Sequence, residues 1–202
     1  MSMTAAAPLA RPQASSPWGW VALAWGAIGF WALLGNALVR LTPMAWDAVE
    51  GGMSFGQWGV MAGWVIAMAY MEGYRGFQKR FSPRFAARAM HLVDVPSVGR
   101  GLLAPLFCMG LFHATRRVLI VSWGVTIGVV LLVIAIRQVD QPWRGIIDAG
   151  VIVGLTWGLV ASVVWMVQAI RRKPLPIGPD VPAAKRATER AAASVGSQTG
   201  QR

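Results

Sequence analysis

The chain has 202 residues, of which 55% are hydrophobic and only 13% are charged, and its formal net charge is +11. Average globular proteins carry roughly 25% charged residues, so this composition excludes an ordinary water-soluble domain. The positive charge does not indicate a nucleic-acid partner, because the basic residues lie in short stretches beside long apolar runs, as in membrane proteins. We expect an all-α, multi-pass protein of a bacterial-type inner (plasma) membrane.

Residues 18–39, 51–71, 118–136 and 149–170 each form an apolar run of 19 to 22 residues without Asp, Glu, Lys or Arg. A helix that rises about 1.5 Å per residue needs about 20 residues to cross a hydrocarbon core of about 30 Å. Four such runs leave too little polar chain to cover them in water, so they predict four transmembrane helices in a domain of residues 18–174. The first run exceeds a signal-peptide core and lacks a cleavage site, so we interpret it as a signal anchor.

Lys and Arg are concentrated between the second and third runs and after the fourth run, whereas the other two connections hold few. Positive charge stays on the cytoplasmic side of membrane proteins, so we expect both termini and the long loop in the cytoplasm. Residues 1–17 and 175–202 are poor in large apolar side chains and predict disordered cytoplasmic tails.

The loop between the second and third runs predicts interfacial helices over residues 83–92 and 101–113. Ser82 and Pro83 are typical of a helix start, Pro96 ends that helix, and Arg and apolar residues take opposite sides of it. The second segment is too short for a fifth span, although a re-entrant piece or a fifth span is the alternative. The basic side chains of this loop predict a docking surface for anionic lipid or a protein partner: Arg75, Lys79, Arg80, Arg84, Arg88, Arg116 and Arg117.

Glu72 follows the second run and is expected at the cytoplasmic end of that span. An ion pair with Arg75 at helical spacing is the simpler interpretation. The functional alternative is a carboxylate at the mouth of a cavity, held by Arg116 or Arg117. No run contains a carboxylate, Lys or Arg at its centre, which argues against a proton-coupled or ion-coupled transporter that works alone.

His91 and His113 are the two histidines and fall on the predicted cytoplasmic side. They are weak candidates for axial haem ligands, because the chain has no Cys-x-x-Cys-His motif. Cys108 is the one cysteine, so a disulfide within the chain and a cysteine metal site are excluded. The sequence also lacks the common catalytic motifs, so we expect no catalytic residue, metal or cofactor.

Small residues predict how the helices pack, because helices in lipid approach closely only where side chains are small. The fourth run carries small residues at a spacing of four, and the third run carries a pair at the same spacing; they are Gly150, Gly154, Gly158, Ser162, Gly124 and Gly128. The short connection between these two runs predicts that they are antiparallel neighbours. A protein partner or a homo-oligomer held by the same faces is also expected.

These features favour a non-catalytic accessory or scaffold subunit of a membrane complex. The first alternative is a small membrane component of a transporter. The second is a membrane enzyme or cofactor binder that acts at the cytoplasmic face.

Overall fold

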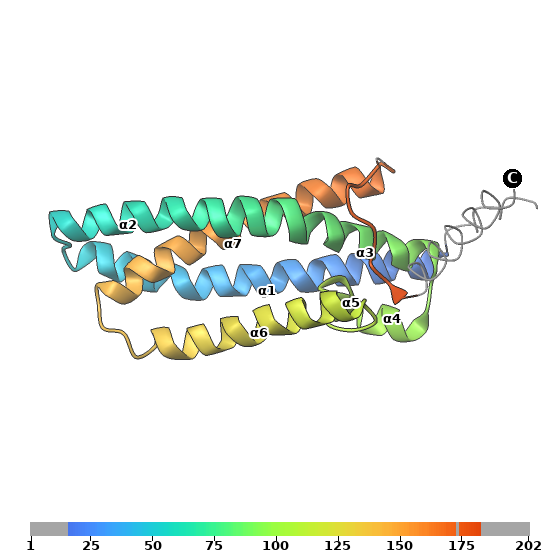
Figure 1. Cartoon of the computed structure of the whole chain (residues 1–202), viewed down its shortest axis with the longest axis horizontal. Helices are drawn as coiled ribbons and strands as arrows, with labels where there is room; N and C mark the ends of the chain where they lie inside the picture. Colours follow the sequence, from blue (N-terminus) through green and yellow to red (C-terminus); the bar gives the residue numbers. More distant parts are fainter. Residues whose placement is uncertain (1–15, 173, 183–202) are drawn as a thin grey trace, which may run out of the picture.

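The long uncharged runs fold as long helices that lie side by side (Figure 1). The structure is a computed structural model that describes residues 16–172 and 174–182. Within these residues, three helices are long and apolar enough to cross a membrane: α1 (Pro17–Glu50), α6 (Arg116–Ile136) and α7 (Trp143–Ile170). The described residues form helices and turns and no strand, which confirms the all-α prediction and fits a membrane protein.

The second apolar run continues as helix far beyond residue 71. α2 (Phe55–Met68) passes without a break into the π-helix η1 (Ala69–Phe81) and then into α3 (Ser82–Asp94), and we call this continuous helix the rod (Figure 1). Ser54 and Gln57 start the rod with a reciprocal capping box. The charged residues after position 71 do not stop the helix, because its other side packs against α7.

α3 is not a separate helix. It continues the rod and packs against α1, α5 and α7, so Phe85 and Met90 are buried. Arg88, predicted on the polar side, is buried as well. Ser82 caps nothing, because the helix already runs through it, and its hydroxyl lacks a hydrogen-bond partner among the described residues. The helix ends before Pro96, as predicted.

Residues 101–113 form neither one interfacial helix nor a fifth crossing. The chain makes two helices of five residues each, α4 (Val98–Leu102) and α5 (Ala104–Cys108), and then turns at Gly110 with a φ of 79°. These short helices pack against α1, where Gly26 leaves room for the backbone of Ala104. The Cys108 thiol is buried there, and burial raises its pKa to about 12.

α6 stands apart from the rest of the bundle along most of its length (Figure 1). It is attached near its start, where the Ser122 hydroxyl donates to the Met109 carbonyl and the Trp123 indole donates to the Leu111 carbonyl. A Cβ at Gly124 or Gly128 would meet no atom within 4 Å. The predicted contact between α6 and α7 is therefore wrong; the small-residue face of α7 is already occupied by other helices.

Both described ends of the chain lie toward the same end of the bundle, together with the connection from α3 to α6 (Figure 1). The segment that follows α7 packs against this end, where Val181 is 1% exposed and Asp180 pairs with Arg84. The prediction of a disordered tail is therefore wrong for residues 174–182. Residues 1–15 and 183–202 of the predicted tails lie outside the described residues.

Candidate functional site

The small residues on one face of α7 each receive a side chain from another helix. A Cβ at Gly150 would overlap the Trp64 indole, and one at Gly158 would stand 2.6 Å from the Phe77 ring. Both of those side chains belong to the rod. Ser162 accepts a hydrogen bond of 3.0 Å from the indole N–H of Trp31 in α1. The small-residue stripe therefore brings α7 close to the rod and to α1.

Gln78 lies where the backbone of the rod is irregular. In η1 the N–H of Ser82 donates to the carbonyl of Phe77, five residues earlier. In the same pattern the Gln78 carbonyl would accept from Pro83, which has no N–H. The indole N–H of Trp165 donates to the Gln78 carbonyl at 3.0 Å instead. The indole N–H of Trp157 donates to the Gln78 side-chain oxygen at 2.8 Å. Two tryptophans of α7 thus hold the rod at its π-helix.

The Glu72 carboxylate faces α7 at Gly154. Its Oε2 lies 2.9 Å from the point where a Cβ at position 154 would stand. Glu72 is half-buried, and no hydrogen bond or ion pair joins it to another described residue. The sequence suggested that Glu72 pairs with Arg75 or is held by Arg116 or Arg117. The structure shows neither contact. Position 154 lies inside the uncharged run of α7, so Glu72 is beside the middle of that helix and not beside its end.

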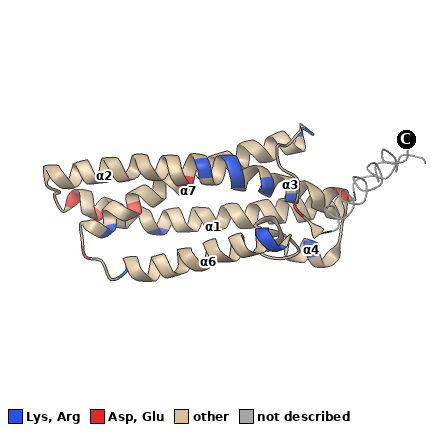
Figure 2. Cartoon of the chain, viewed as in Figure 1, with Lys and Arg blue, Asp and Glu red and all other residues tan. Residues whose placement is uncertain are grey.

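The basic residues predicted as one docking surface lie in three different settings. Arg75, Lys79 and Arg80 are exposed on η1, and we call them the basic strip. The Lys and Arg of the rod lie from its middle into α3, and none lies in α2 (Figure 2). Arg116 and Arg117 are exposed at the start of α6. Arg84 and Arg88 make contacts inside the protein.

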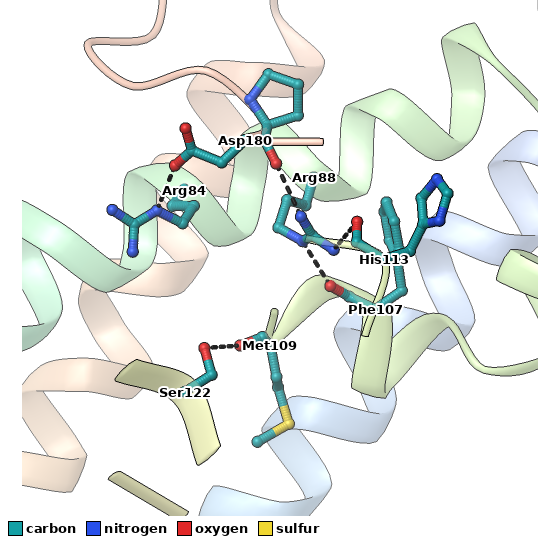
Figure 3. Close-up of polar contacts among 8 residues, drawn as sticks. Arg84, Arg88, Phe107, Met109, His113, Ser122 and Asp180 are labelled. Atoms are coloured by element: carbon teal, nitrogen blue, oxygen red, sulfur yellow. Dashed lines mark hydrogen bonds and ion pairs between the residues drawn. The ribbon is translucent and has the colours of Figure 1, made fainter. Parts of the chain in front are cut away.

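Arg88 is 0% exposed and binds backbone carbonyls from three segments of the chain (Figure 3). Its Nε donates to Phe107 at 2.6 Å, its Nη1 to Pro179 at 2.8 Å, and its Nη2 to Phe112 at 2.9 Å and to His113 at 3.3 Å. Its guanidinium carbon also lies 4.1 Å from the centre of the Phe107 ring. Arg88 was predicted to face lipid or a partner, and this is wrong because its donors are used inside the fold.

No carboxylate of the described residues forms an ion pair with Arg88. The nearby Asp180 forms an ion pair of 2.9 Å with Arg84, as Figure 3 shows. Burial lowers the pKa of Arg88 to about 10, and the charges of Cys108 and Asp180 oppose this shift. At neutral pH the buried cation is thus stabilised by oriented carbonyl dipoles. Arg88 joins α3, the segment after α5 and the segment after α7, which makes it a structural anchor.

Both histidines lie beside the ring of Phe107. The ring centre of His91 is 6.2 Å from that of Phe107, and the ring centre of His113 is 6.4 Å from it. Nε2 of His91 is 2.9 Å from Nη1 of Arg100, so the imidazole accepts and is neutral. Both weak candidates for haem ligands therefore lie next to the buried Phe107 ring. The described residues hold no cluster of three or more His, Cys, Asp or Glu that could bind a metal ion.

Comparisons with protein-family models, with curated proteins and with solved structures gave no match. The site is therefore interpreted from its own geometry.

The sequence reasoning missed Gln78, Trp157 and Trp165. A partial signal was present: Pro83 has no N–H, so a helix that runs through it must leave one carbonyl of the preceding turn without its donor. The sequence does not show that Trp165 lies next to the Gln78 carbonyl, because the two residues are 87 positions apart along the chain.

Proposed function

We propose that the chain is a four-span inner-membrane protein that serves as a non-catalytic accessory or scaffold subunit of a larger membrane complex. In this proposal α1, the rod, α6 and α7 each cross once, and both termini lie in the cytoplasm. The grouping of the described termini at one end of the bundle supports this orientation. The exposed Arg116 and Arg117 at that end would rest on anionic head groups.

The main support for the proposal is the position of the basic strip along the length of α7. Arg75 and Lys79 lie within a turn of Glu72 and Gln78, two side chains that contact α7 at positions 154 and 157. These positions are inside the uncharged run 149–170 of α7. Exposed charges at such a height are costly against lipid and are normally covered by protein. A partner that brings acidic or polar groups to the strip would cover them.

Two further surfaces support an accessory role. An apolar groove of about 600 Å³ runs along the outer side of α7 beside Gln78, lined among others by Trp157, Val160 and Trp165. The open face of Gly124 and Gly128 on α6 is unoccupied by any described residue. Small-residue faces of this kind let helices of two proteins approach closely.

Site-specific photocrosslinking in the host membrane tests the proposal. A benzophenone amino acid in place of Tyr70, an exposed aromatic residue of η1, leaves the basic strip intact. We expect a stoichiometric adduct with another membrane protein, lost in the double variant Arg75→Glu, Lys79→Glu. The exposed Arg137, in the turn between α6 and α7, gives the matched control Arg137→Glu, which should keep the adduct. Adducts with lipid alone, or with a second copy of this chain alone, would overturn the proposal.

One observation favours the transporter component as a second candidate. Carriers coupled to protons or ions need a titratable group within the membrane, and Glu72 lies beside the middle of α7. The same photocrosslinked partner would then be a larger transport subunit. The following inference about Glu72 does not depend on a partner.

A further inference from the structure

The position of Glu72 differs from that of the other acidic residues in the described helices. It lies in η1, against the small-residue face of α7, where Gly154 provides the space for its carboxylate. Met68, one turn earlier, and Phe77, one turn later, fill the same face beside Gly150 and Gly158. The Glu72 carboxylate is therefore placed between apolar contacts on both sides along the helix axis.

No charged group of a neighbouring helix faces this carboxylate. α2 has no charged residue, and α1 has none before Arg40. In α7 the uncharged run separates Gly154 from the nearest charges, Asp148 before it and Arg171 after it. Asp148 is itself next to Arg144, at 3.9 Å from its Nε.

The charged groups within the rod also either bind other residues or are exposed. Arg84 pairs with Asp180, and Arg88 binds carbonyls. The basic strip is exposed, and none of its side chains lies within 4 Å of the Glu72 carboxylate. Glu72 is thus a carboxylate without a described counter-charge or hydrogen-bond donor, beside the uncharged middle of α7.

An unpaired carboxylate away from water is costly as an anion and much less so as the neutral acid. We propose that Glu72 is a proton-binding site at membrane depth, which holds one proton in the described bundle and releases it when the rod moves against α7. On release, the O–H bond of the Glu72 carboxyl breaks and the proton passes to water. The π-helix offers the movement: it has more residues per turn than an α-helix, so a return to α geometry would turn Glu72 away from Gly154.

Carbodiimides of different solubility test this site on the full-length protein in mild detergent. A protonated carboxyl adds across the carbodiimide C=N bond and rearranges to a stable N-acylurea, which peptide mass spectrometry locates. We expect the hydrophobic reagent dicyclohexylcarbodiimide to modify Glu72, and labelling to decline as the pH is raised. A water-soluble carbodiimide should modify the exposed Glu50 and leave Glu72 unmodified. Equal modification of Glu72 by both reagents, or none by the hydrophobic one, would overturn the proposal.

Two variants sharpen the experiment. Glu72→Gln keeps the shape of the side chain and should lose the hydrophobic labelling, whereas Glu50→Gln should keep it. Mapping the modified peptide in the unaltered protein gives the answer even where Glu72→Gln folds poorly. Labelling that persists on another carboxyl, such as Asp148, and spares Glu72 would also overturn the proposal. Because the purified chain is labelled alone, a failed partner search does not change the result.

Discussion

Oε2 of Glu72 lies 2.9 Å from the position that an alanine Cβ at residue 154 would occupy. The atom in the way is the end of a flexible side chain, so it can turn aside. We therefore expect Gly154→Ala to fold with little loss of stability and to move the Glu72 carboxylate. Gly154→Leu is too large for such an adjustment and should disrupt the bundle, seen as aggregation or altered migration in mild detergent.

Gly158→Ala should be more harmful than Gly154→Ala. The added Cβ would stand 2.6 Å from the Phe77 ring, whose edge-on contact with the Phe81 ring leaves it little room to turn. Overpacking of this kind costs roughly 1–3 kcal/mol in the free energy of unfolding. Gly128→Ala on α6 is the matched control, because its Cβ meets nothing within 4 Å. Equal stability of the two variants in a denaturant titration would contradict the close approach of α7 and the rod.

Trp165→Phe tests the missing backbone donor of the rod. The substitution keeps an aromatic ring but removes the N–H that donates to the Gln78 carbonyl. A buried acceptor left without a donor costs about 1–3 kcal/mol in the free energy of unfolding. Trp157→Phe should cost less, because the Gln78 side chain that it leaves can rotate to another partner.

A double-mutant cycle with Pro83→Ala gives the control for Trp165→Phe. Alanine at position 83 has the N–H that the Gln78 carbonyl lacks in η1 geometry. We expect Trp165→Phe to cost less in the Pro83→Ala background than in the parent, as measured by unfolding in detergent. Strictly additive effects would show that the two donors do not serve the same carbonyl.

Arg88→Lys should destabilise the end of the bundle that holds the termini. One ammonium cannot reproduce the planar set of donors that Arg88 directs at carbonyls from three segments. We expect a loss of about 3 kcal/mol in the free energy of unfolding, together with faster tryptic cleavage at Arg172. Arg80→Lys, at an exposed position of the basic strip, should behave as the parent. Unchanged cleavage in Arg88→Lys would contradict its role as an anchor.

The local properties of the chain could be predicted from the sequence, and its long-range relationships could not. The uncharged runs around α1, α6 and α7 were found because exclusion of charge over about 20 residues is a local property. Arg88 was misplaced because a local amphipathic pattern puts arginine outward. Its partners lie 19 to 91 residues away, and nothing near Arg88 indicates them. The unbroken helix beyond residue 71 was missed for the same reason, since it packs against α7, which is distant along the chain.

Acidification should destabilise the protein through His91. Burial, then the charges of Arg100 and Arg88, lower the pKa of His91 below 6.5, with a smaller lowering by His113 and an opposing contribution from Asp94. The folded protein therefore binds this proton less tightly than the unfolded chain. The stability is complete above pH about 6.5 and decreases as the pH falls below that value toward the lower pKa of the folded state.

His91→Gln is the variant that isolates this effect. Glutamine can still accept a hydrogen bond from Arg100 but does not titrate. We expect the melting temperature of the parent to fall more steeply between about pH 7 and about pH 5 than that of His91→Gln. Parallel melting curves across this range would show that other groups control the acid response.

The central claim is that η1 lies at the height of the middle of α7, inside the membrane. Spin labels at Met71 on η1, Val160 on α7 and Ile170 at the end of α7 test it most directly, since all three side chains are exposed on the bundle. In liposomes, collisions with oxygen and with a water-soluble nickel complex report the depth of each label. Met71 and Val160 should both report the bilayer interior, with oxygen favoured, and Ile170 a shallower position. A Met71 label that collides with the nickel complex as readily as Ile170 does would contradict the account.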